Sequence, residues 1–233
     1  MNIKTIGEFG EKYVGEFLVA DIGRRDEIKS DWYEGLKFFF SKSFYRGRKD
    51  EISENFQKRA MEVVENFDLK NNIKRFKSSE FEELLVANKV NNRVDRRMIC
   101  QTIEMIRHNN GRNIVLYSIE QIHDGNISGV YQELCNIYGV ADKIATFFLR
   151  DLALVFELEN EIKKQDFIYF QPIDTWVKQV SDKLGVTEPR DDREVTKSKI
   201  INKCLIEHTS PLLFNAGAWY VGKHSFDILL NYV

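Results

Sequence analysis

Apolar residues recur along most of this chain at the three-to-four-residue spacing of an α-helix. One such face consists of Phe56, Ala60, Val63, Val64 and Phe67, and another of Met98, Ile99, Ile103 and Ile106. A stripe with this period buries one side of a helix. Alternating segments typical of strands are scarce, the best being 113–117, Asn-Ile-Val-Leu-Tyr. The spacing therefore predicts an all-α fold.

Several helix ends are marked by residues that cap or break helices. Ser79 followed by Glu82 is typical of a capping box, and Asp95 is expected to cap the helix that ends at Asn109-Asn110-Gly111. Asp174 precedes an apolar stripe that ends at Gly185, so we expect its side chain at a helix amino terminus. Pro211 suits the first turn of a later helix.

Composition excludes several classes of protein. The chain has 233 residues, of which 43% are hydrophobic, and no apolar run approaches the roughly 20 residues of a membrane span. Its three cysteines are widely separated, so neither a zinc nor an iron–sulfur site is expected, and we predict no cofactor. The amino terminus lacks the pattern of an export peptide. We expect a cytoplasmic protein, associated with the nucleoid if its source is a prokaryote.

The net charge of −2 means that any contact with nucleic acid must be local. Two basic clusters could supply it. The first contains Arg46, Arg48 and Lys49, and the second contains Arg93, Arg96 and Arg97. Either cluster alone is more typical of a solvated surface.

A glycine-containing segment, Gly139-Val140-Ala141-Asp142, separates two apolar helical stretches. A tight turn of this kind exposes successive backbone amides, and the second helix adds the positive end of its dipole. A phosphate can bind there without a basic side chain. Taken alone, the segment is more often an ordinary connection between helices.

Residues 139–145, followed by Pro172-Ile173-Asp174-Thr175-Trp176-Val177 and Leu184-Gly185, resemble the helix-hairpin-helix DNA glycosylase superfamily in its lysine-bearing branch. The resemblance implies that Lys143 is the nucleophile and Asp174 its partner, with Gly139, Val140 and Ala141 at the DNA backbone. It also implies a two-lobed helical fold, with the hairpin lobe at about 70–180 and a second lobe at about 1–69 plus 181–233. Two departures from the family pattern are Ala141 in place of a glycine and the carboxylate of Asp142.

Further residues resemble the archaeal-type 8-oxoguanine glycosylases. Phe147 matches an aromatic residue that flanks the base, and the segment 215–220, Asn-Ala-Gly-Ala-Trp-Tyr, resembles the carboxyl-terminal part of the base pocket. The implied pocket consists of Phe147, Trp176, Asn215 and Trp219, and Asn215 stands where that group usually has a carboxylate. Residues 43–51 also resemble the amino-terminal helix turn of the group.

This resemblance implies an enzyme of base excision repair that removes an oxidised purine, 8-oxoguanine in the first place, and then cleaves the strand. Lys143 must lose its proton before attack, which a half-apolar site favours, and Asp174 would stabilise the positive charge that develops on the sugar. The expected partner is double-stranded DNA with a damaged base, and the expected oligomeric state is a monomer. Three alternatives stay open: a non-catalytic DNA-binding module, a scaffold domain, and a glycosylase for another damaged base.

Overall fold

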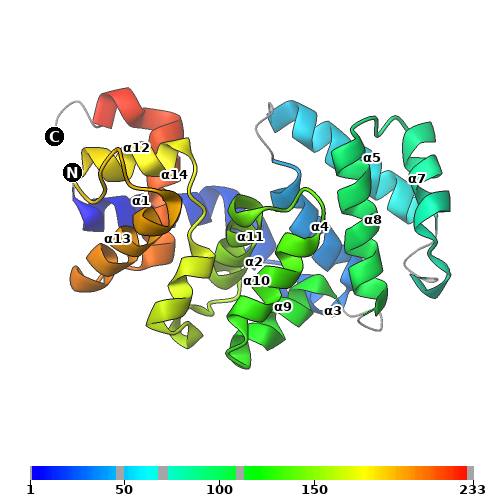
Figure 1. Cartoon of the computed structure of the whole chain (residues 1–233), viewed down its shortest axis with the longest axis horizontal. Coiled ribbons are helices and arrows are strands. Elements are labelled where there is room, and N and C mark those ends of the chain that lie inside the picture. The colour runs from blue at the N-terminus through cyan, green and yellow to red at the C-terminus, as the bar shows by residue number, and fades with distance from the viewer. Residues whose placement is uncertain (1, 46–49, 68–72, 109–112, 230–233) are drawn as a thin grey trace. The chain divides into compact units, whose positions relative to one another are not determined.

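The computed structural model describes residues 2–45, 50–67, 73–108 and 113–229, and within these ranges every regular element is helical (Figure 1). The prediction of an all-α protein is therefore confirmed. Among these residues, no helix combines the length and the apolar character needed to cross a bilayer.

The chain divides into two compact units. The central unit comprises Arg24–Phe148, and the terminal unit comprises Met1–Gly23 together with Leu149–Val233. This division differs from the predicted lobes, 70–180 and 1–69 plus 181–233. The amino-terminal contribution to the terminal unit ends at Gly23, because α1 packs along α14 whereas α3 and α4 pack against α9.

The central unit contains seven α-helices and one short 3₁₀ helix among its described residues, and then the start of α11. They are α3 (Arg25–Ser30), α4 (Trp32–Ser43), α5 (Asp50–Asn66), η2 (Ile73–Arg75), α7 (Ser78–Ala87), α8 (Arg93–His108), α9 (Ile114–His123), α10 (Ile127–Asn136) and α11 (Asp142–Val155). Its core is rich in aromatic side chains: the ring of Phe148 meets those of Phe38 and Phe39 edge-on at 5.9 and 5.1 Å. These contacts bind α11 to α4.

The terminal unit begins with α1 (Ile3–Tyr13), the π-helix η1 (Val14–Leu18) and α2 (Val19–Ile22). After α11 it continues with η3 (Glu159–Glu161), η4 (Lys164–Phe170), α12 (Thr175–Lys183), α13 (Arg193–Ile206) and α14 (Pro211–Leu229). Helices α1, α12, α13 and α14 lie together (Figure 1). Their shared core consists of Ile3, Ile6, Ile173, Val177, Val180, Val186, Ile200, Cys204, Phe214, Ala218 and Val221.

Helices α1 and α14 pack so closely that only glycine fits at the contact. A Cβ atom at Gly217 would overlap the carbonyl oxygen of Ile6, and one at Gly10 would overlap the backbone of Leu213. The close approach brings Tyr13, at the end of α1, to the side of α14 that carries Asn215 and Trp219.

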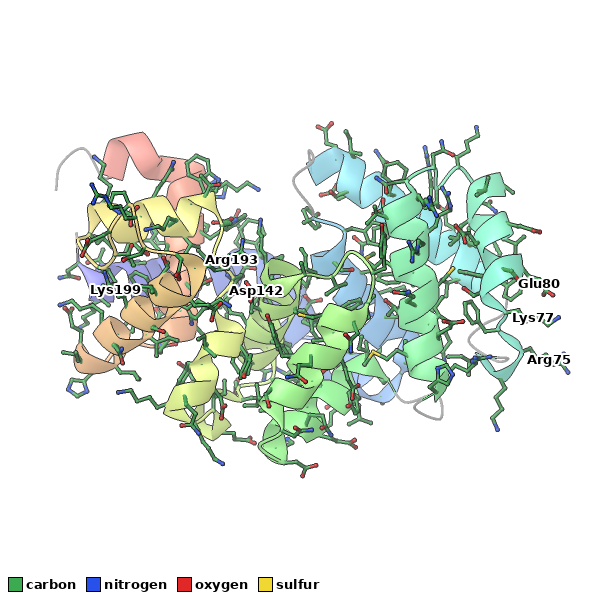
Figure 2. All side chains as sticks on the ribbon, viewed as in Figure 1. Arg75, Lys77, Glu80, Asp142, Arg193 and Lys199 are labelled. Carbon is green, nitrogen blue, oxygen red and sulfur yellow. The ribbon has the colours of Figure 1, made fainter. Side chains whose placement is uncertain are left out.

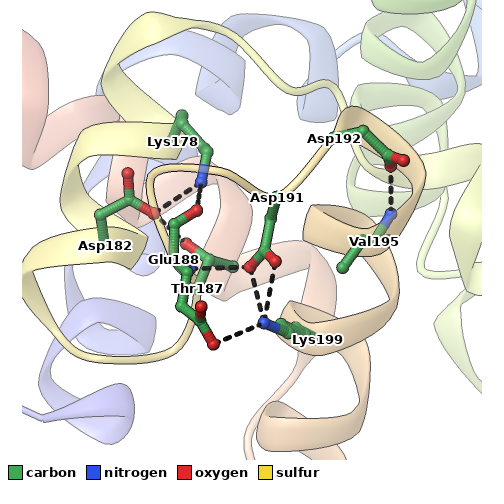
Figure 3. Close-up of polar contacts among 8 residues, drawn as sticks. All are labelled: Lys178, Asp182, Thr187, Glu188, Asp191, Asp192, Val195 and Lys199. Atoms are coloured by element: carbon green, nitrogen blue, oxygen red, sulfur yellow. Dashed lines mark hydrogen bonds and ion pairs between the residues drawn. The ribbon is translucent and has the colours of Figure 1, made fainter.

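Charged side chains hold the connection between α12 and α13 (Figure 3). The Lys178 ammonium lies 2.7 Å from a carboxylate oxygen of Asp182, which also accepts a hydrogen bond from the Thr187 hydroxyl at 2.5 Å. Lys199 of α13 lies 2.8 Å from Asp191. Because these bonds join both helices to the loop, the connection is fixed at each end.

The segment 113–117 is helical, and its reading as the best candidate strand is wrong. Asn113 caps α9, since its side-chain oxygen accepts hydrogen bonds from the backbone amides of Val115 and Leu116 at 2.7 and 3.4 Å. Its amide group donates to the carbonyls of Ile28 and Asp31 at 2.6 and 2.7 Å. The buried Asn113 thus ties α9 to the α3–α4 connection.

Two predicted caps are also wrong. Helix α7 begins at Ser78, ahead of Ser79, and no side chain caps it. Lys77 and Glu80, labelled in Figure 2, form an exposed ion pair of 2.7 Å at this end. In α8 the capping bond comes from Asn92, whose side-chain oxygen accepts from the amide of Val94 at 2.8 Å.

Asp95, the predicted cap of α8, instead lies buried in the first turn of the helix. The predicted stop at 109–111 lies outside the described residues, and α8 is described to His108. By contrast, the cap at Asp174, the end of its helix just before Gly185 and the placement of Pro211 at the start of α14 are confirmed. Gly185 has a left-handed backbone, with φ of 68°.

Candidate functional site

The predicted turn between two helices lies in the central unit, between α10 and α11. Gly139 adopts a left-handed conformation with φ of 84°, which a side chain would disfavour. The amide of Val140 donates to the carbonyl of Ile137 at 2.9 Å, and the carbonyl of Ala141 accepts from the amide of Ala145 at 3.0 Å. Ala141 therefore closes the first turn of α11 and is itself exposed.

A basic residue of α8 packs against this turn. The guanidinium of Arg97 lies 3.8 Å from the ring centre of Tyr138, directly before Gly139. From the same helix, the side-chain oxygen of Gln101 accepts a hydrogen bond from the amide of Tyr138 at 2.5 Å. The second basic cluster of the sequence thus contributes a positive charge beside the hairpin turn.

The carboxylate of Asp142, the residue that seemed least compatible with phosphate binding, accepts a hydrogen bond from the Tyr131 hydroxyl at 2.9 Å. Figure 2 labels Asp142 at the start of α11. Burial, followed by this bond, raises the pKa of Tyr131 well above its usual range, so the phenol stays a donor. Asp142 is therefore bound to α10 at one carboxylate oxygen, and an acidic residue in the first turn also suits the dipole of α11.

Lys143 lies in the first turn of α11 and is half-buried. Phe147 is also half-buried, and its position one turn further along the helix places it on the same face as Lys143. Ile144 and Phe148 are buried in the core. The residues after Lys143 thus pack into the core, and the apolar setting of its amine stays a prediction.

Asp174 is the N-cap of α12 in the terminal unit, and its carboxylate accepts a hydrogen bond from the amide of Val177 at 2.9 Å. This bond holds the side chain at the start of the helix. Pro172 and Ile173, just before it, are buried. Lys143 belongs to the central unit and Asp174 to the terminal unit, and each is described within its own unit.

The aromatic residues of the implied base pocket are partly accessible. Trp219 is half-buried, with its ring edge-on to those of Tyr13 and Phe17 at 5.7 and 5.6 Å. The Lys223 ammonium lies 4.8 Å from the centre of the Trp219 ring. Trp176 is 37% exposed. Both residues belong to the terminal unit and are exposed in part.

Asn215, the fourth residue of that implied pocket, is fully buried and bonded within the protein. Its side-chain oxygen accepts from the guanidinium of Arg150 at 2.9 Å. Its amide donates to the carbonyl of Pro172 and to the side-chain oxygen of Gln171, both at 3.2 Å. Gln171 in turn donates to the carbonyl of Pro211 at 3.2 Å. Asn215 therefore contacts the chain just before Asp174.

Arg150, which bonds to Asn215, forms a buried charge pair with Asp151. The guanidinium of Arg150 donates a hydrogen bond to a carboxylate oxygen of Asp151 at 2.7 Å. It donates another to the hydroxyl oxygen of Tyr13 at 2.9 Å. Tyr13 donates to the other oxygen of Asp151 at 2.8 Å. Burial, followed by the negative charge of Asp151, raises the pKa of Tyr13 well above its usual value, so the hydroxyl keeps its proton.

The sequence reasoning did not identify Arg150 and Asp151. The available signal was two charged residues inside an apolar helical run, between Leu149 and Leu152. The other predicted DNA contacts, Arg46, Arg48 and Lys49, lie outside the described residues.

Comparison with known proteins adds little to this geometry. No protein-family model matches the chain, and no solved structure matches it. A segment of 72 residues, 31% of the chain, is 39% identical to the uncharacterized protein MJECL21 of Methanocaldococcus jannaschii. That match covers 16% of the length of the archaeal protein.

Proposed function

We propose that this chain is a bifunctional DNA glycosylase and abasic-site lyase with the two-lobed helical fold of the helix-hairpin-helix glycosylases. The observation that carries the proposal is the start of α11. There a left-handed Gly139 closes a tight turn, and the half-buried Lys143 follows in the first turn of the helix. This is the setting in which a lysine can meet a sugar whose phosphate is held by the turn.

Binding to DNA is supported at the hairpin by two features. The backbone amides at the start of α11 offer donors to a phosphate. Arg97, stacked on Tyr138, adds a cation close to the same turn. A chain with a net charge of −2 can therefore hold a duplex through a small, locally positive surface.

The proposed chemistry requires the damaged nucleotide to leave the helix stack, at a cost of a few kcal/mol. The neutral amine of Lys143 attacks C1′ of the deoxyribose and forms a C–N bond, while the bond between C1′ and the base breaks and the base departs with a proton. As this bond lengthens, the carboxylate of Asp174 stabilises positive charge on the sugar. Opening of the ring gives a Schiff base, and β-elimination then releases the 3′ phosphate.

The preferred substrate is an oxidised purine, 8-oxoguanine in the first place. This choice is supported by two half-buried aromatic residues, Phe147 one turn after Lys143 and Trp219 in α14. Both are suited to stacking on an extruded purine. A glycosylase for an oxidised pyrimidine would share the same lysine chemistry, so the substrate panel below includes one.

The test is incubation with duplexes that carry 8-oxoguanine, uracil, an oxidised pyrimidine or an abasic site, with and without borohydride. The parent protein should excise at least one of these bases, 8-oxoguanine fastest, and form a covalent adduct. Lys143→Gln should do neither, whereas Lys183→Gln, at an exposed lysine in the last turn of α12, should match the parent. Duplex binding without any adduct would assign a DNA-binding module, and loss of salt-dependent binding altogether would assign a scaffold.

A further inference from the structure

The terminal unit buries two charged side chains that are adjacent in the sequence and paired with each other. Arg150 and Asp151 are exposed by 2% and 0%. Removing two charges from water costs more than their attraction usually returns, and apolar residues of similar size often serve stability better. A buried charge pair that stands next to a proposed catalytic segment is therefore a candidate for a role in catalysis.

We propose that Asn215 is a positioning residue, which Arg150 orients so that it holds the segment before Asp174 and thereby sets the place of that carboxylate. The proposal rests on the function proposed above. It replaces the expectation, taken from family resemblance, that Asn215 contacts the base.

The segment that leads to Asp174 is held on both sides. Before it, the Asn215 amide donates to the carbonyl of Pro172, two residues away, and to the side chain of Gln171. After it, the carboxylate of Asp174 accepts from the amide of Val177 in α12. Movement of Asp174 is therefore opposed by the hydrogen bond from the Asn215 amide to Pro172 and by the hydrogen bond that caps α12.

Arg150 decides which way the Asn215 amide points. A guanidinium only donates hydrogen bonds, so the Asn215 atom that faces it must be the oxygen. The amide nitrogen is then directed to the carbonyl of Pro172. A carboxylate at position 215 could accept from Arg150, but it could not donate to Pro172, which explains why an amide suits this position.

Arg150 is itself held by hydrogen bonds to Asp151 and Tyr13, and nearby acidic groups act on its pKa. Burial lowers the pKa of Arg150, but the negative charge of Asp151, together with smaller contributions that include Asp174, outweighs burial and raises it. The guanidinium is thus cationic, and Asp174 is among the acidic groups that favour its charge. Through Asn215, this cation is bonded to the segment that leads to Asp174.

The experiment is a double-mutant cycle on single-turnover excision of 8-oxoguanine with the parent, Asn215→Ala, Asp174→Asn and the double variant. If Asn215 acts through Asp174, Asn215→Ala should slow the chemical step by about 10- to 100-fold, because small displacements of a catalytic group have effects of this size. In the Asp174→Asn background the same change should cost less than about twofold, since residues that act as a unit are not additive.

Two further variants separate positioning from other roles. Asn215→Asp keeps an oxygen toward Arg150 but cannot donate to Pro172, so it should be as slow as Asn215→Ala, and it serves in its place should Asn215→Ala fail to fold. Asn113→Ala removes a buried asparagine of the central unit and should lower stability without slowing excision by the folded protein.

The outcomes are distinct. Additive losses in the cycle, or full activity in Asn215→Asp, would overturn the positioning role and leave the glycosylase proposal standing. Losses that differ between 8-oxoguanine and a second excised base would assign Asn215 to base contact and likewise overturn it. A parent protein that excises no base and forms no adduct would overturn both proposals.

Discussion

Each unit of the molecule is tied together by one buried asparagine, but the two asparagines have different surroundings. Asn113 in the central unit bonds to backbone groups, among them the carbonyls of Ile28 and Asp31. Asn215 in the terminal unit joins backbone and amide groups to the charged side chain of Arg150. The first arrangement is neutral, whereas the second contains a charge pair.

The difference shows what each network is suited to do. Neutral bonds to backbone carbonyls satisfy buried polar groups and connect α9 to the α3–α4 connection, which is sufficient for a structural role. A buried charge pair contributes little to stability on its own account. Its place next to the segment that carries Asp174 is therefore better explained by a requirement of the site than by a requirement of the fold.

The largest expected effect on stability is that of Arg150→Met. It removes the guanidinium beside the buried carboxylate of Asp151, and we expect the free energy of unfolding to fall by about 3–5 kcal/mol. Urea denaturation measures this loss. The matched control is Lys197→Met, which removes another buried cation, but one whose partner Glu194 is 63% exposed at its side chain. Equal losses in the two variants would contradict the special importance assigned here to the buried pair of Arg150 and Asp151.

Asn113→Ala should have the next largest effect. It leaves the carbonyls of Ile28 and Asp31 and the amide of Val115 without their side-chain partner. We expect a loss of about 2–3 kcal/mol in the free energy of unfolding, because buried polar groups lose their hydrogen bonds. Thermal denaturation, with excision assayed well below the midpoint, checks that the loss is one of stability alone. A slower chemical step in the folded variant would show that Asn113 has a functional role as well.

Arg97→Gln tests the assignment of DNA binding to the central unit. We expect duplex affinity to fall by about three- to tenfold, with the same loss for different sequences and a salt slope lower by about 1, because one cation near a phosphate is removed. Fluorescence anisotropy at several salt concentrations measures both quantities. The single-turnover excision rate at saturating protein should stay unchanged, and a change there would place Arg97 closer to the chemistry than proposed.

The smallest expected effects are two shifts of opposite sign with pH. In the central unit, burial would raise the pKa of Glu34, but the bonds to Lys37 and Arg24 together lower it. A carboxyl group whose pKa is lowered on folding stabilises the protein at pH values above its pKa in the unfolded chain. This stabilisation is lost as the pH falls through its pKa in the folded protein. Glu34→Gln should therefore destabilise at pH 7 by about 0.2–1 kcal/mol, with no difference from the parent in strong acid.

In the terminal unit, burial raises the pKa of Glu159, and the Ser210 hydroxyl opposes this only in part. A carboxyl group whose pKa is raised on folding contributes its stability at pH values below its pKa in the unfolded chain. That stability is lost as the pH rises through its pKa in the folded protein. Glu159→Gln should stabilise the protein at pH 7 and match the parent below about pH 4, the usual range of a free glutamate. Denaturation curves of both variants from pH 3 to 7 test the two signs, and shifts of the same sign would refute this account.

How far the sequence could predict the structure depended on the distance between interacting residues. Asp174 was correctly placed as a cap because its partner, Val177, is three residues away. The turn at Gly139 was found for the same reason. The segment 113–117 was misread because its apolar residues fit a short strand equally well, and the cap that makes it helical is reinforced by bonds to Ile28 and Asp31, more than 80 residues away.

The candidate site shows the same limit. Family resemblance identified Lys143, Asp174 and Asn215 as candidate site residues, but it predicted that Asn215 lines the base pocket. Its buried position follows from the close approach of α1 and α14 at Gly217 and from the bond to Arg150, 65 residues away. Arg97 was known only as part of a basic cluster until the packing of α8 placed it against Tyr138.

By itself, the sequence determined that the chain is helical, that a tight turn precedes Lys143, and that Asp174 begins a helix. Each of these is decided within one or two helical turns, by the period of apolar residues, by the freedom of glycine and by a side chain that reaches its own backbone. The tertiary structure alone decided that Arg97 packs against Tyr138 beside the turn, and that Asn215 bonds to Arg150 and to the segment before Asp174. Those contacts join distant parts of the chain, and only the packing of the core selects them.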